Sequence, residues 1–97
     1  MDNFTYEKLK DLLKIGHEIE FEFGGIFCSI NNSQNENHKA SWYFSTNHKG
    51  EFTNTFLADF YDVESLLTSL DKIKIKEKSL KEIIDNKLYD PSTLTIF

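Results

Sequence analysis

The sequence of 97 residues contains a single cysteine, Cys28. One cysteine excludes an intramolecular disulfide and a cysteine-rich zinc site. Long apolar runs are missing as well, since none approaches the roughly 20 residues that a membrane-spanning helix needs. The first ten residues, "MDNFTYEKLK", also lack the apolar segment of a signal peptide. These absences predict a cytoplasmic protein that does not associate with a membrane.

Basic residues are outnumbered, with 11 lysines and arginines against 16 aspartates and glutamates and a net charge of −5. General nucleic-acid binders need a basic surface that displaces counterions from phosphates, so this balance argues against that class. An acidic chain is suited to a basic partner. The same charge is also typical of an ordinary small domain kept in solution.

Motifs for catalysis, cofactors and metals are missing too. The sequence has no glycine-rich phosphate loop and no G-x-S-x-G elbow. Its three histidines, His17, His38 and His48, never have the i,i+2 or i,i+4 spacing of a metal site. Two "NHK" copies, at 37–39 and 47–49, bracket a predicted strand and therefore cannot share one site. We assign no catalytic residue, no metal and no cofactor.

What the sequence does contain is apolar material for one core. Hydrophobic residues make up 39% of the chain and aromatic residues 14%, nine of them phenylalanine. A chain of this length buries one core and not two. We therefore predict a single domain over residues 1–97.

The firmest structural signal is the stretch "HEIEFEF" at 17–23, followed by Gly24 and Gly25. Apolar and acidic residues alternate in it, which is typical of a strand with one buried face. Two glycines between alternating runs indicate a hairpin with a type I′ turn, which needs positive φ at both positions. That turn predicts the pairs Phe23–Ile26, Phe21–Cys28 and Ile19–Ile30 on the core face, and Glu22–Phe27, Glu20–Ser29 and Glu18–Asn31 on the other. Cys28 is then a buried, inert thiol.

The remaining segments have weaker signals. A helix is predicted over 4–15, with Thr5 as N-cap and Gly16 as its stop. Further helices begin after Asp62 and, through a Ser79–Glu82 capping box, at 79–82. The predicted loops and strands are a polar loop at 31–40, strand 41–46 with Trp42 and Phe44 inward and Tyr43 outward, a turn at 47–50, strand 51–57 with Phe52 and Phe56 inward, and a strand at 92–97 after Asp90–Pro91.

Together these segments predict an α+β fold. Its sheet is antiparallel and four- to five-stranded, a meander built on the Gly24–Gly25 hairpin. One N-terminal and two C-terminal helices are expected to pack on one face of it.

The combination of "LKDLLKIGHEIEFEFGG" with "SLKEI" resembles small uncharacterised proteins of low-GC Gram-positive bacteria and their phages or mobile elements. The shared pattern falls at Leu9–Gly16, His17–Gly25, Trp42–Phe44, Glu64–Leu67 and Lys78–Ile83. This chain departs from it in the long 31–40 segment and in "KEK", which lacks glycine before the last helix. The resemblance implies a similar fold and a bacterial or phage setting, and it brings no catalytic residues.

One surface stands out as a candidate for partner binding. Glu18, Glu20 and Glu22 share the outer side of the hairpin with Phe27, and Tyr43 joins them if strand 41–46 pairs beside 26–32. Three interpretations remain open for the glutamates: they are solvated, they receive a basic partner, or they pair with Lys72, Lys74 and Lys76. The last requires "KIKIK" at 72–76 to lie beside 17–23. A catalytic carboxylate pair is disfavoured, because an open sheet face offers no evident pocket to separate two pKa values.

These features favour a non-enzymatic protein-binding module, such as an immunity or antitoxin-like protein, a phage inhibitor of host defence, or an adaptor. The alternative is a small-molecule-binding or enzymatic domain that uses a cleft between sheet and helices. A third hypothesis is a homodimer joined at an edge strand or at the Tyr43 face.

Overall fold

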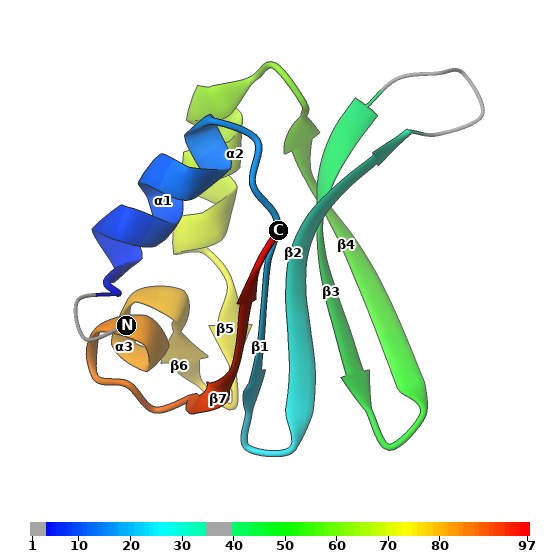
Figure 1. The fold of residues 1–97 in the computed structure, drawn as a ribbon. Helices are drawn as coiled ribbons and strands as arrows, with labels where there is room; N and C mark the ends of the chain where they lie inside the picture. Colours follow the sequence, from blue (N-terminus) through cyan, green and yellow to red (C-terminus); the bar gives the residue numbers. More distant parts are fainter. Residues whose placement is uncertain (1–3, 35–39) are drawn as a thin grey trace.

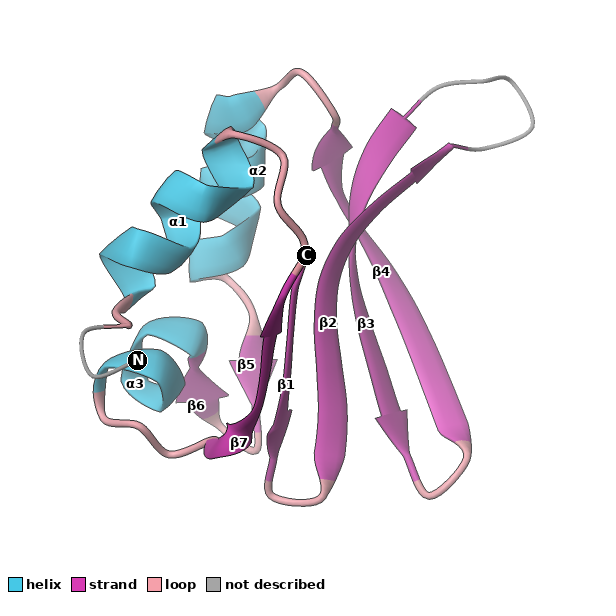
Figure 2. Cartoon of the chain, viewed as in Figure 1, coloured by secondary structure: helices cyan, strands magenta, loops and turns pink. Residues whose placement is uncertain are grey.

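The computed structural model describes residues 4–34 and 40–97 of the chain. In this part, three helices lie together on one side of a twisted antiparallel sheet (Figures 1 and 2). The helices are α1 (Tyr6–Lys14), α2 (Val63–Asp71) and α3 (Leu80–Asp85). The strands of the sheet are β1 (Ile19–Phe23), β2 (Ile26–Gln34), β3 (Ala40–His48), β4 (Glu51–Asp59) and β7 (Asp90–Ile96).

The five strands are ordered β4-β3-β2-β1-β7. The first four form a meander, and the last strand of the chain lies beside the first. A separate small hairpin is made by β5 (Lys74–Ile75) and β6 (Lys78–Ser79). The predicted α+β fold is therefore confirmed, with five strands in its main sheet.

The β1–β2 hairpin has the predicted register. Phe21 pairs with Cys28 and Glu22 with Phe27. Gly24 and Gly25 have φ values of 58° and 81°, the conformation that a type I′ turn requires. The agreement arises because the turn and the apolar pattern independently specify the same pairing.

The helix ends also follow the sequence signals. The Thr5 side chain accepts a hydrogen bond from the Lys8 amide, and Gly16 follows α1 with a φ of 94°. Asp62 accepts from the Ser65 amide at the start of α2. At α3, Ser79 and Glu82 form the complete capping box. These caps satisfy amide groups that have no partner within a helix.

The core lies between the helices and the sheet face that they cover, which we call the inner face. The helices contribute Tyr6, Leu9, Leu13, Leu66, Leu70, Leu80, Ile83 and Ile84, and the inner face contributes Ile19, Phe21, Phe23, Cys28, Ile30, Trp42 and Phe44. The predicted inward positions of Trp42 and Phe44 are thus confirmed. The opposite face of the sheet, which carries Glu20, Phe27 and Tyr43, is the outer face.

Among the segments between elements, one prediction is wrong and one of the open interpretations is excluded. The polar stretch at 31–34 belongs to β2, because each of its residues pairs with β3. Residues 35–39, which include His38 and the first "NHK", lie outside the described part of the chain. In "KIKIK", Lys72 is the C-cap of α2 and only 74–75 form a strand, which pairs with 78–79. β7 occupies the edge of β1 instead, so the lysine pairing of the glutamates is excluded.

The prediction that Phe52 and Phe56 point inward is also wrong. Both rings are exposed on the outer face. The turn at Lys49 and Gly50 pairs His48 with Glu51, so Phe52 lies opposite Asn47 and Phe56 opposite Tyr43. A register shift at Leu57 then turns Leu57 and Ala58 into the core. The buried residues of β4 are therefore Leu57 and Ala58, which come after the two exposed phenylalanines in the sequence.

The C-terminal strand begins at Asp90, two residues before the predicted start, and includes Pro91. Proline is tolerated here because β7 is an edge strand. Within residues 4–34 and 40–97, no helix has the length and apolar character needed to cross a membrane.

Candidate functional site

Three rows of side chains cross the outer face from β1 towards β4. Antiparallel pairing places the residues of each row on adjacent strands. The rows are Glu22–Phe27–Asn47–Phe52, Glu20–Ser29–Ser45–Asn54, and Asn31–Tyr43–Phe56. Aromatic residues therefore lie on both sides of a polar middle row.

Ser29, Ser45 and Asn54 of the middle row form a connected hydrogen-bond chain with Asn31 of the neighbouring row. The side-chain amide of Asn31 donates to the hydroxyl oxygens of Ser29 (3.0 Å) and Ser45 (3.1 Å), and the Ser45 hydroxyl donates to Asn54 Oδ1 (2.6 Å). Ser29 and Ser45 are buried, although they belong to the outer face. They form the floor of a shallow hollow of about 480 Å³, whose walls include Phe27 and Phe52. Hydrogen bonds thus fix the floor of this hollow in one arrangement.

Aromatic rings stand around this floor. Phe27, Phe52 and Phe56 are 43%, 66% and 56% exposed. Tyr43 packs edge-to-face on Phe56, with ring centroids 6.0 Å apart. Exposed aromatic rings gathered on one face are typical of interaction sites.

The glutamates at the β1 end of the rows differ in their surroundings. The Glu18 carboxylate accepts a hydrogen bond from the backbone N–H of Asn32 at 2.9 Å. This contact extends the β1–β2 pairing beyond the first residue of β1. Glu18 therefore has a structural role. Glu20 and Glu22 pair with Thr95 and Asp90 of β7, so Glu22 lies beside another carboxylate.

The predicted site residues Glu20, Glu22, Phe27 and Tyr43 are thus brought together on one face, with Glu18 held at its border. Sequence reasoning missed Phe52 and Phe56. The signal was present in "NHKG", because a two-residue turn at Lys49–Gly50 gives the pairing of Tyr43 with Phe56 directly.

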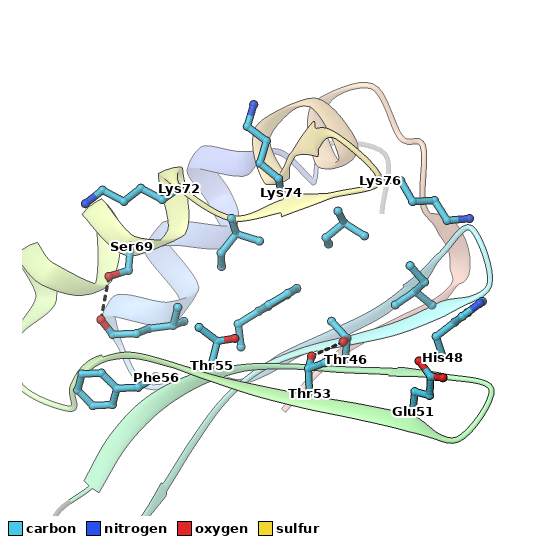
Figure 3. A pocket seen from close by; sticks show the side chains of 15 residues that line it. Thr46, His48, Glu51, Thr53, Thr55, Phe56, Ser69, Lys72, Lys74 and Lys76 are labelled. Atoms are coloured by element: carbon cyan, nitrogen blue, oxygen red, sulfur yellow. Dashed lines mark hydrogen bonds between the residues drawn. The ribbon is translucent and has the colours of Figure 1, made fainter.

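A second cavity lies on the inner face, between the β3–β4 hairpin and the chain from α2 to β5 (Figure 3). We call it the inner groove. Its volume is about 670 Å³. Apolar walls come from Ile26, Phe44, Leu57, Ile73 and Ile75, and β3 and β4 add Thr46, Thr53 and Thr55. It exists because the helix layer does not reach the first part of β4, where residues 51–56 are all exposed.

Polar groups around the inner groove are engaged with the fold. Lys76 donates to the Gly24 carbonyl at 2.7 Å, and His48 Nδ1 lies 3.2 Å from the Gly25 carbonyl. Ser69 donates to the carbonyl of Leu57. Figure 3 shows the ends of Lys72 and Lys74 directed away from the groove. The groove therefore presents apolar surface and threonine side chains more than convergent charge.

Two further groups bear on possible chemistry. Burial raises the pKa of the Cys28 thiol to about 12, so the thiol stays protonated and is a poor nucleophile near neutral pH. His17 Nδ1 contacts the carbonyl oxygen of Phe97, so this ring is engaged with the end of β7. In the part of the chain that the structure describes, no three His, Cys, Asp or Glu side chains gather as a metal site.

No family model, no curated protein and no solved structure matches this chain. The outer face and the inner groove are two surfaces of the described chain that offer room for a partner or a ligand.

Proposed function

We propose that this protein is a non-enzymatic binding module whose outer face receives a basic protein partner. The observation that carries the proposal is the aromatic cluster of exposed Phe27, Phe52 and Phe56 with half-buried Tyr43, on the sheet face that the helices leave uncovered. Aromatic residues, phenylalanine included, are enriched in the cores of protein interfaces, where a few buried anchors supply most of the binding energy.

Charge supports a basic partner. Glu20, Glu22 and Asp90 lie along one end of the aromatic cluster, and the chain carries a net charge of −5. Complementary charge accelerates encounter and orients the partner, while the rings provide the affinity. The ordered floor of the outer face reduces the entropy lost on binding, because its side chains already have fixed partners.

A cytoplasmic role in a bacterium or phage belongs to the same proposal. It is supported by the resemblance of the sequence to small bacterial and phage proteins and by the buried, unpaired thiol of Cys28. In such a setting, the module acts as an immunity or antitoxin-like protein, an inhibitor of host defence, or an adaptor.

The test is quantitative capture of partners from an extract of the source cell. We expect Phe52→Ser and Phe56→Ser each to reduce recovery of the specific partner by about tenfold or more, as loss of an interface anchor does. Ile15→Ser is the matched control, because Ile15 is 73% exposed but lies at the end of α1. Equal recovery with all three variants contradicts the proposal.

The role of the outer-face glutamates is tested by comparing two sets of glutamate-to-glutamine variants. The double variant Glu20→Gln, Glu22→Gln should slow association and weaken its dependence on salt. Glu64→Gln removes an exposed carboxylate from α2 and should leave both unchanged. A partner whose binding ignores the outer-face glutamates contradicts the basic-partner assignment.

The inner groove supports a second candidate, the binding of a small, largely apolar molecule. Its volume of about 670 Å³ lies within the range of ligand pockets, and its walls are mainly apolar. Ile73→Asp places a charge in the wall and should abolish binding of an apolar fluorescent dye, whereas Leu88→Asp should not, because Leu88 does not line the groove. If the unmutated chain does not bind the dye, this candidate is contradicted.

A further inference from the structure

The first part of β4 is an uncovered sheet edge. β4 is the edge strand opposite β7 in the large sheet and has nine residues. Residues 51–56 are exposed, while the edge beyond them is closed by α2, where Ser69 donates to the Leu57 carbonyl at 2.8 Å. This stretch contains neither lysine nor proline, the residues that usually protect an edge from pairing.

The backbone of this edge is ready to form another ladder. The two-residue turn makes His48–Glu51 a hydrogen-bonded pair, and pairs of the two kinds alternate along an antiparallel ladder. Thr53 and Thr55 therefore bond to β3. The N–H and C=O groups of Phe52, Asn54 and Phe56 point the other way, towards the open side.

The sequence of the edge, "FTNTF" at 52–56, reads the same in both directions. In an antiparallel pair centred on Asn54, the strand therefore meets its own sequence in matching order. We propose that a second copy of this chain binds along β4, with a twofold axis at Asn54, and joins the two five-stranded sheets into one. About six backbone hydrogen bonds form, two for each of three hydrogen-bonded pairs.

Each cross-strand pair in this register is favourable. On the outer face, Phe52 meets Phe56 of the second copy, and the two Asn54 side chains lie opposite each other. On the inner face, Thr53 meets Thr55 of the second copy. Aromatic pairs and threonine pairs both stabilise adjacent strands, by roughly 0.2–1 kcal/mol each.

Charge does not oppose the pairing. Glu51 is the single charged residue of 51–56. In the proposed register it faces Leu57 of the second copy, which places the two Glu51 residues about six positions, or roughly 20 Å, apart along the strands. Apart from Glu51, the charged residues that give the net charge of −5 lie outside 51–56.

The palindrome favours a second copy over a strand from another protein. A twofold interface requires the same patch to complement itself, and "FTNTF" does so without any change of side chain. The inference goes beyond the proposed function. It also makes the outer faces of two copies continuous, so that the aromatic clusters lie side by side.

Analytical ultracentrifugation of the full chain over a concentration series tests the proposal. We expect a dimer that dissociates on dilution. The variant Thr53→Lys, Thr55→Lys places like charges opposite each other twice and should raise the dissociation constant at least tenfold. The variant Thr53→Lys, Thr55→Glu places opposite charges at the same two contacts and should restore the dimer. Both threonines are exposed, so both variants should retain the parent's circular dichroism.

Backbone pairing is tested separately. Asn54→Pro removes an outward N–H without touching the β3 ladder and should give a monomer, whereas Asn54→Ala keeps that N–H and should remain dimeric. The proposal is overturned if the parent chain stays monomeric at about 1 mM. It is equally overturned if the chain stays monomeric and β4 pairs only with a strand from another protein. A Thr53→Lys, Thr55→Lys variant that dimerises like the parent also overturns it. If the lysine–glutamate variant fails to dimerise, the proposed register is overturned.

Discussion

The Lys76 ammonium group donates to the Gly24 carbonyl across 2.7 Å and links two tight turns that lie 52 residues apart in the sequence. Both turns have left-handed backbone conformations: Lys76 and Glu77 have φ values of 51° and 68°, and Gly24 has 58°. The contact holds the tip of the β5–β6 hairpin against the tip of β1–β2. It also forms one end of the inner groove.

Gly24→Ala should destabilise the protein by about 1–3 kcal/mol, because alanine is strained at this φ. Its Cβ would also lie 2.8 Å from Lys76 Nζ, so the ammonium group must move and lose its hydrogen bond. Gly16→Ala is the control, since Gly16 has positive φ but nothing within 4 Å of an added Cβ. Urea unfolding should show that Gly24→Ala and Lys76→Ala are less than additive. Full additivity would contradict the coupling between the two turns.

Glu18→Ala should cost about 1–2 kcal/mol of stability, because it leaves the partly buried Asn32 amide without its charged acceptor. Glu18→Gln should cost less, since the amide oxygen can still accept. Glu20→Ala is the control, because it shows how much stability is lost when a neighbouring glutamate of the same strand is removed. Equal losses for Glu18→Ala and Glu20→Ala in chemical denaturation would show that Glu18 is not structural.

Phe52→Ala should change the free energy of unfolding by less than about 1 kcal/mol, because the ring is 66% exposed. Phe44→Ala, on the inner face of β3, should cost roughly 3–5 kcal/mol. The contrast is measured in one urea series at a protein concentration held constant. A large loss for Phe52→Ala is inconsistent with the outward orientation of β4.

The free energy of unfolding should fall above pH 10, because Tyr6 then loses its proton more readily in the unfolded chain than in the folded one. Burial raises the pKa of Tyr6 above its ordinary value of 10.0, and the hydrogen bond to Asp71 (2.7 Å) raises it further. The folded state therefore keeps the phenol protonated where the unfolded state loses the proton. Its contribution is complete below pH 10 and is lost as the pH rises above that value.

The measurement is the free energy of unfolding from pH 8 to 11 in a Cys28→Ala background, which removes a second group with a raised pKa. Tyr6→Phe should flatten the alkaline decline. An unchanged slope would assign the decline to other groups.

The sequence predicted the β1–β2 hairpin residue by residue because two signals agreed there. Gly24 and Gly25 specify the turn, and the apolar face of each strand then admits one register. The helix caps at Thr5, Asp62 and Ser79 were predictable for a similar reason, since each cap acts on amides within the next few residues.

What the sequence left open or predicted wrongly were long-range choices that local patterns do not determine. "KIKIK" alternates like a strand, yet its neighbour along β1 is β7, which approaches from the end of the chain. For β4, the assumption that large aromatic residues face the core outweighed the register of the Lys49–Gly50 turn. The outer face was therefore predicted with its glutamates, Phe27 and Tyr43, but without Phe52 and Phe56.

The uneven cover of the helices divides the sheet into two regions of different local stability. The inward side chains of β1 and β2 are buried in the core, whereas residues 51–56 are exposed on both faces. Fraying of the turn end of the β3–β4 hairpin, from Asn47 to Asn54, leaves the buried Phe44 and Leu57 in place. It therefore exposes little new apolar surface and requires only part of the global unfolding free energy. Amide protons of β3 and β4 near their shared turn should exchange with solvent far sooner than those of Phe21 and Cys28.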